Sequence, residues 1–251
     1  MINTLNDLEK QERELYYKEY EKQQSGTRAA GPISKNFGKV FYSLFETNFT
    51  KLTEHSFHFQ KLNYPGYKDI KSDKNLLPNK VQNLLNIKNK RILDFGTGTG
   101  EFCNDISSKY QNSSVVGVDL ATVDMGLTDE HSTQNCKFVS AGATELPFQD
   151  NSFDLITSFL ALEHIHYENI EKLFSEFSRI SKEGFMFQIS HRAKNSNNMR
   201  RISEDLLWWY EKISKVSDDV CLYYFEKDNY KWGSSPIGLG MSRWVCAGVK
   251  K

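Results

Sequence analysis

Short apolar runs alternate with helical stretches in the middle of the chain, between about residue 90 and about residue 190. Five of these runs have the length and the branched or aromatic content of strands: 91–95, 115–119, 137–140, 153–159 and 184–190. Helical spacing separates them, most clearly at 101–110 and at 167–180. Strands that alternate with helices predict a parallel sheet covered on both faces.

The two ends of the chain differ from this middle zone. Residues 1–88 are polar and rich in aromatic side chains, and they predict helices at 5–23 and at 37–59. Near the other end, a helix is expected at 202–216, and two last strands at 220–225 and 242–249. We therefore divide the chain into a helical N-terminal extension, 1–88, and an α/β domain, 89–251.

Composition serves mainly to exclude classes of protein. Lys+Arg and Asp+Glu are both 32, so the formal net charge is zero, which argues against nucleic-acid or anionic-membrane partners. The four cysteines lack metal-binding or redox spacing, which indicates reduced thiols and predicts a cytoplasmic protein. No apolar run approaches the roughly 20 residues of a membrane span, and the polar N-terminus has no signal-peptide core. Oligomeric state is left open.

The most informative motif is Asp94-Phe95-Gly96-Thr97-Gly98-Thr99-Gly100, which follows a predicted strand and opens a helix. Alternating glycines let the backbone turn sharply and let a ligand lie against bare main chain. Asp119 ends the next strand about twenty residues later, where a carboxylate can accept hydrogen bonds from the two hydroxyls of a ribose. A tight turn without a ligand is the alternative, but three alternate glycines cost entropy that a turn alone does not require.

The spacing of the glycines also discriminates between nucleoside ligands. A dinucleotide fingerprint starting at Gly96 would need a glycine at position 101, which is Glu101. A carboxylate, Asp94, instead precedes the glycines, and it would repel a phosphate and attract an ammonium group. S-adenosylmethionine joins an adenosine to an amino-acid ammonium and a sulfonium, so the pattern favours this cofactor.

Four stretches taken together resemble the core of the class I S-adenosylmethionine-dependent methyltransferases, in their type 11 small-molecule branch: 92–100, 116–119, 143–154 and 162–165. The resemblance implies an α/β, Rossmann-like, seven-stranded sheet that is mostly parallel, with an antiparallel last strand and helices on both faces. It implies that the glycine loop holds the methionine end of the cofactor, Asp119 the ribose, and the Ala143 region the adenine. The cofactor-binding residues predicted in this way are Asp94, Gly96, Thr97, Gly98, Gly100, Asp119, Leu120, Ala143 and Thr144.

One position departs from the family pattern. Many relatives have Asp-Ala ahead of the Leu-Pro-Phe run, and this Asp accepts a hydrogen bond from the adenine amino group. Here the pair is Gly142-Ala143, so another group makes that bond or cofactor binding is weaker. The departure keeps open a second hypothesis, a cofactor-binding partner subunit that is catalytically silent.

Histidines follow the fourth predicted strand in the run Glu163-His164-Ile165-His166. The carboxyl end of a strand in such a sheet faces the ligand crevice, so His164 is a candidate general base for a hydroxyl or amine acceptor. A packing or helix-capping role is the alternative, and His191, after the fifth strand, is the other candidate base. Two ligands on one loop are few, and we expect no metal.

The acceptor is the least determined part of the function. Trp208-Trp209 lies on the helix predicted at 202–216, and adjacent helical residues point in different directions, so one ring is expected in the core. A similar pair occurs in bacterial methyltransferases of surface-polysaccharide clusters, a loose resemblance that implies a sugar or nucleotide-sugar acceptor. The expected function is therefore methyl transfer to a small molecule, with residues 1–88 as a candidate substrate lid. A same-fold enzyme with other chemistry, such as decarboxylation, is a third hypothesis.

Overall fold

The structure, a computed structural model, describes residues 5–24, 57–61, 70–71, 80, 83–84, 86–120, 122, 127, 132–190, 201–204, 206–225 and 243–251. Two predictions lie outside these residues: the helix at 37–56 and the alternative base His191.

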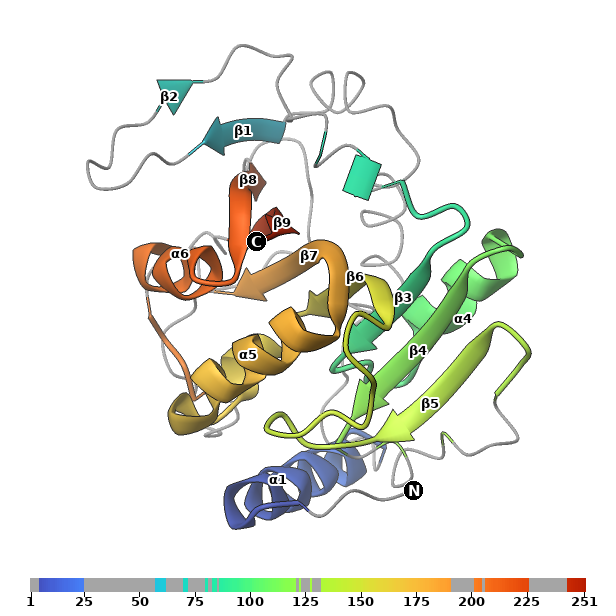
Figure 1. The fold of residues 1–251 in the computed structure, drawn as a ribbon. Coiled ribbons are helices and arrows are strands. Elements are labelled where there is room, and N and C mark those ends of the chain that lie inside the picture. The colour runs from blue at the N-terminus through green and yellow to red at the C-terminus, as the bar shows by residue number, and fades with distance from the viewer. Residues whose placement is uncertain are drawn as a thin grey trace.

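Five parallel strands form the centre of the sheet, in the spatial order β5-β4-β3-β6-β7 (Figure 1). Their bounds are β3 Arg91–Phe95, β4 Ser114–Asp119, β5 Cys136–Ser140, β6 Phe153–Phe159 and β7 Ser181–Ser190. The last strand, β9 (Arg243–Lys250), lies between β7 and β8 (Ser217–Phe225) and is antiparallel to both. These seven strands confirm the predicted sheet, mostly parallel with an antiparallel last strand.

Two further strands come from the N-terminal extension. β1 (Phe57–Lys61) pairs antiparallel with β8, and β2 (Ile70–Lys71) pairs with β1, so the sheet has nine strands within the part of the chain that the structure describes. The predicted helix 37–59 is therefore wrong at 57–59. Residues 57–60 alternate between aromatic and polar side chains, which is the period of a strand. The edge of β8 offers backbone hydrogen-bond partners, and these favour a strand over a helix here. The domain boundary at residue 88 stays a prediction.

Helices cover both faces of the sheet, as predicted (Figure 1). The helices whose bounds the structure describes are α1 Asp7–Gln24, α4 Glu101–Lys109, α5 Ile170–Ile180 and α6 Leu206–Ser214, with short 3-10 turns η3 Leu162–His164 and η4 Tyr167–Asn169. α4 packs on β4 and β5, α5 lies over β7 on the other face, and α1 lies beyond the carboxyl ends of β4 and β5. Within the described residues, no helix combines the length and apolarity needed to cross a membrane.

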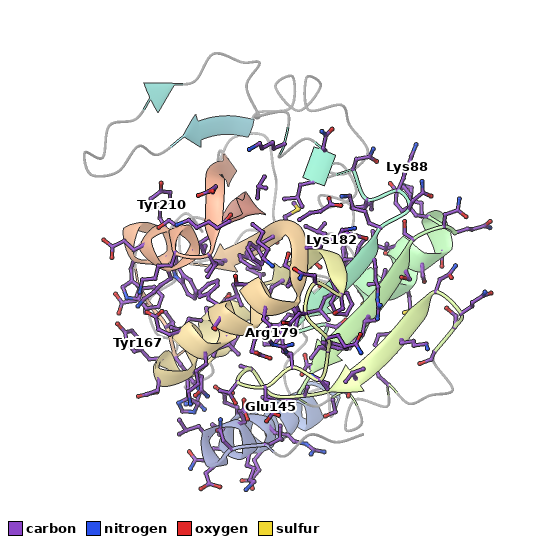
Figure 2. All side chains as sticks on the ribbon, viewed as in Figure 1. Lys88, Glu145, Tyr167, Arg179, Lys182 and Tyr210 are labelled. Carbon is purple, nitrogen blue, oxygen red and sulfur yellow. The ribbon has the colours of Figure 1, made fainter. Side chains whose placement is uncertain are left out.

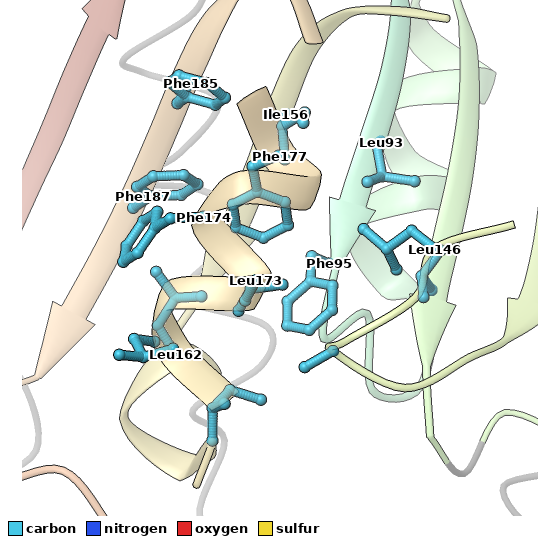
Figure 3. Packing of buried hydrophobic residues seen from close by; sticks show 14 of the residues in the cluster. Leu93, Phe95, Leu146, Ile156, Leu162, Leu173, Phe174, Phe177, Phe185 and Phe187 are labelled. Atoms are coloured by element: carbon cyan, nitrogen blue, oxygen red, sulfur yellow. The ribbon is translucent and has the colours of Figure 1, made fainter. Parts of the chain in front are cut away.

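An aromatic cluster fixes α5 on the sheet (Figure 3). The rings of Phe95 on β3 and Phe177 on α5 meet edge to face with centroids 5.2 Å apart, and Phe187 on β7 stacks on Phe177 at 5.5 Å. All three are at most 4% exposed, and burial of such a side chain contributes about 1.5–3 kcal/mol. The strands that carry the functional loops therefore have a rigid base.

The two adjacent tryptophans of α6 divide as predicted. Trp209 is fully buried in the core, whereas Trp208 is half-buried and donates a hydrogen bond from Nε1 to the hydroxyl of Tyr167 at 3.1 Å. One ring therefore anchors α6 and the other contributes to the surface.

Candidate functional site

The glycine loop, residues 96–100, joins β3 to α4 at the carboxyl edge of the sheet. Gly96, Gly98 and Gly100 all have positive φ angles, of 74°, 55° and 75°, which glycine adopts without the strain that a side chain would bring. The loop is held to β4 because the N–H groups of Gly96 and Thr97 both donate to the carbonyl of Val118, at 2.7 and 3.0 Å. It therefore presents bare backbone at the edge where open α/β sheets bind their ligands.

Gly96 is also constrained by a neighbour. A Cβ added there would lie 2.2 Å from the Cβ of Ala161, which follows β6. The segment after β6 thus packs directly on the glycine loop, and the structure brings these two predicted parts of the site together.

Asp119 lies at the end of β4, where the sequence predicts the ribose-binding carboxylate. Its Oδ2 accepts a hydrogen bond from the N–H of Gly98 at 3.0 Å, and the residue is half-buried. Leu120 follows it and is also half-buried, and its carbonyl accepts from the hydroxyl of Ser140 at 3.0 Å. One carboxylate therefore ties the glycine loop to the end of β4, at the edge where open α/β sheets bind their ligands.

Asp94 is buried, with only 2% of its surface exposed. Its Oδ1 accepts from the hydroxyl of Thr157 at 3.0 Å, and its Oδ2 accepts from the thiol of Cys103 at 3.7 Å. Burial raises the pKa of Asp94 to about 7, and nearby Asp119 adds to the rise, although hydrogen bonds from Thr97, Thr157 and Cys103 act in the other direction. The negative charge of Asp94 would act on a ligand across the glycine loop. An ammonium group nearby would in turn favour the ionised form of this carboxylate.

The loop after β5 carries Ala143 and Thr144 and is firmly held. Arg179 on α5 donates to the carbonyls of Leu146 at 3.0 Å and Phe148 at 2.6 Å, and its hydrogen bonds lower the pKa of Glu176, which accepts from the N–H of Leu146. Figure 2 shows Arg179 near this loop, whose Glu145 lies beside α1. The predicted adenine region therefore has a rigid backbone.

α1 is attached to this loop through Glu9, a residue that sequence reasoning missed. Its Oε1 accepts from both the N–H and the hydroxyl of Thr144, each at 2.9 Å. Its Oε2 accepts from the N–H of Asn6 at 2.9 Å, and Asn6 Oδ1 accepts from the N–H of Glu9 at 3.0 Å. The Asn6-x-x-Glu9 pattern is a capping box, which could have predicted where the helix starts. No local pattern could have predicted the contact with Thr144.

A second carboxylate, Glu12, attaches α1 to the segment after β6. Its Oε1 accepts from the N–H of His166 at 2.7 Å and lies 3.7 Å from Nε of Arg201. Burial raises the pKa of Glu12 to about 7, although the His166 hydrogen bond and Arg201 oppose the rise. α1 therefore bridges the loop that follows β5 and the segment that follows β6.

His164 is half-buried in η3, three residues beyond Ala161. The turn is set by Leu160, a non-glycine residue with a φ of 53°, whose N–H donates to Gln188 at 2.8 Å. Since Ala161 packs on the glycine loop, His164 belongs to a segment beside that loop, and its role as a base stays a prediction. Over the described ranges, no group of three His, Cys, Asp or Glu side chains could hold a metal ion.

Comparison with known proteins agrees with this geometry. The methyltransferase domain family matches residues 92–184. The chain is 26% identical over 167 residues to the sterol 4-C-methyltransferase strm-1 of Caenorhabditis elegans, covering 62% of this chain and 47% of that protein. It is 36% identical over 96 residues to a demethylmenaquinone methyltransferase of Roseiflexus castenholzii, covering 38% and 39%.

Among solved structures, phosphoethanolamine N-methyltransferase 2 of Haemonchus contortus, in complex with phosphomonomethylethanolamine and S-adenosylhomocysteine, matches with a TM-score of 0.51 and 18% identity. The match covers 69% of this chain and 52% of that one, and it shows the shared fold. The chain spans less than half the length of the two sequence relatives. Residues 92–184 therefore carry a methyltransferase domain, and the relatives and the solved structure that match it support S-adenosylmethionine as the cofactor.

Proposed function

We propose that the protein binds S-adenosylmethionine along the carboxyl edge of β3, β4 and β5 and transfers its methyl group to a small-molecule acceptor. The observation that carries the proposal is the hydrogen bond from the N–H of Gly98 to Asp119, which joins the carboxylate proposed to bind the ribose to a loop of bare backbone. The family match over residues 92–184 supports the same reading. The Gly142 departure does not remove the site, because the loop and Asp119 are intact.

The chain contributes mainly alignment to this reaction. S-adenosylmethionine, when bound, supplies an activated methyl group. Asp119 accepts from the ribose, the glycine loop orients the amino-acid end, and α1 excludes water from the crevice. His164 takes the proton from the acceptor's hydroxyl or amine, a contribution of roughly a hundredfold or more to the rate of such reactions.

The class of acceptor is a finer proposal. The exposed ring of Tyr167 lies against Trp208, with centroids 5.3 Å apart, and such an aromatic surface suits the apolar face of a sugar. This supports a sugar or nucleotide-sugar acceptor, whereas the two sequence relatives are named for sterol and menaquinone chemistry. A cytoplasmic location also remains part of the proposal, and it is supported by Cys103 and Cys136, which are not disulfide-bonded.

The test is a transfer assay with purified protein, S-adenosylmethionine labelled at its methyl group, and fractions of a metabolite extract. Label that moves into a small-molecule fraction, and fails to do so with Asp119→Ala, supports the proposal. Cofactor binding without any transfer would favour a silent partner subunit. Conversion of an extract component without label would favour other chemistry on the same fold.

A further inference from the structure

Position 142 is glycine for reasons of space. Its backbone is not among the positive-φ glycines, so conformation alone does not require glycine there. A Cβ at Gly142 would lie 2.2 Å from Cδ of Glu9 and 2.3 and 2.5 Å from its two carboxylate oxygens. A side chain at position 142 and the carboxylate of Glu9 therefore compete for one volume, and here Glu9 fills it.

Glu9 is held in that volume by its surroundings. The residue is 1% exposed, and Thr144 and Asn6 hold both carboxylate oxygens through the hydrogen bonds described above. Asn6 also donates from Nδ2 to the hydroxyl of Thr144 at 3.1 Å, so the cap of α1 and the loop form one network. Three hydrogen bonds from described residues reach the carboxylate, which leaves capacity for another donor, because an ionised carboxylate offers about four lone-pair sites.

The network lies where a nucleoside base would be expected. Asp119 is paired in register with Ser140 on β5, and the N–H of Ala141 donates to the carbonyl of Asp119 at 3.2 Å. A ribose on Asp119 would therefore direct its base toward residues 142–144, the next segment along the edge. Ala143 is buried there and offers an apolar contact, whereas the Glu9 carboxylate can only accept hydrogen bonds.

We propose that Glu9, from α1, supplies the carboxylate that recognises the exocyclic amino group of adenine and so makes this domain selective for adenosine cofactors. The inference rests on the proposed cofactor site. It makes Glu9 a specificity-determining residue in addition to an anchor of the helix. It also explains how a chain with glycine at position 142 retains an acidic group beside the base.

The experiment compares two ligands by calorimetry, S-adenosylhomocysteine and S-inosylhomocysteine, in which a carbonyl replaces the amino group. Wild-type protein should prefer the adenosine ligand by about tenfold or more, the effect of roughly one charge-assisted hydrogen bond. Glu9→Gln should remove this preference, because its amide can donate to the inosine carbonyl. Glu12→Gln, on the same helix but bonded to His166, should keep it.

A rescue variant covers the case in which Glu9→Gln does not fold. Glu9→Ala leaves room for a side chain at position 142, so Glu9→Ala with Gly142→Asp should regain the preference that Glu9→Ala alone loses. The inference would be overturned if Glu9→Gln kept the preference for the adenosine ligand, or if it lost affinity for both ligands equally. Glu9 would then only anchor the helix. Binding of neither ligand to wild-type protein would instead refute the cofactor site itself, and this inference with it.

Discussion

The Oδ2 atom of Asp119 lies 3.0 Å from the backbone nitrogen of Gly98, and this hydrogen bond joins the end of β4 to the loop after β3. The same carboxylate is proposed to accept from the ribose. The proposal therefore links the geometry of the glycine loop and the affinity for the cofactor through one side chain.

Replacing Asp119 should weaken the cofactor more than it weakens the fold. Charge-assisted hydrogen bonds are worth about 1.5–3 kcal/mol each, so Asp119→Ala should raise the dissociation constant of S-adenosylhomocysteine at least tenfold. Asp119→Asn keeps an oxygen for Gly98 and should fold like the wild type, yet still bind more weakly. An unchanged constant in both variants, measured by calorimetry, would place the ribose elsewhere.

Gly96→Ala should lower stability by two separable effects. The φ of 74° costs a side chain about 1–2 kcal/mol, and the contact with Ala161 adds an overpacking cost of roughly 1–3 kcal/mol. Adding Ala161→Gly removes the contact but not the backbone cost, so the double variant should recover part of the loss in urea unfolding. No recovery would show that Ala161 does not press on the loop.

The folded protein should lose stability as the pH rises from about 4.5 to about 7. Burial raises the pKa of Glu12 from 4.5 to about 7, so over this range the folded state binds more protons than the unfolded state. Asp94 acts in the same direction, since its pKa is also raised to about 7. The combined loss should amount to several kcal/mol in urea unfolding at a series of pH values, and His166, whose pKa burial lowers from 6.5, opposes it in part.

Glu12→Gln isolates the contribution of the helix. It should flatten the pH dependence of the unfolding free energy, while Glu14→Gln, an exposed change on the same helix, should not. If the unfolding free energies of the wild type and Glu12→Gln depend equally on pH, burial does not raise the pKa of Glu12 in the folded protein.

The strand pattern of the domain could be predicted from sequence, because each central strand is a short apolar run between turn residues. β3 and β6 begin and end where they were predicted to. β1 was missed because a strand forms there only by pairing with β8, which is distant in the sequence, although the alternating pattern of β1 was visible. Glu9 and Glu12 were missed for the same kind of reason, since charged residues on a polar helix indicate a solvated face unless their partners are known.

The glycine loop and Asp119 could be singled out from the sequence because glycines after one strand and an acidic residue at the end of the next form a local pattern. Their role in binding the cofactor stays a prediction. Predicting which side chain lies against Gly142 was not a local problem. It required the contact between Glu9 and the residue pair 142 and 144, more than a hundred positions away in the sequence.

His164→Ala should leave cofactor affinity unchanged and lower turnover by about a hundredfold or more, once an acceptor is known, because a positioned base typically contributes that much. Single-turnover rates with the labelled cofactor would measure the effect. Retention of most of the turnover would mean that the acceptor is already a reactive nucleophile and that His164 serves packing.

The most direct test of the cofactor site is calorimetric titration of wild-type protein and Gly98→Val with S-adenosylhomocysteine, S-adenosylmethionine and a nicotinamide dinucleotide. Wild-type protein should bind both adenosyl ligands at micromolar strength and not bind the dinucleotide. Gly98→Val should bind none of them, because its side chain would fill the space over the loop. Binding of the dinucleotide without either adenosyl ligand would contradict the account.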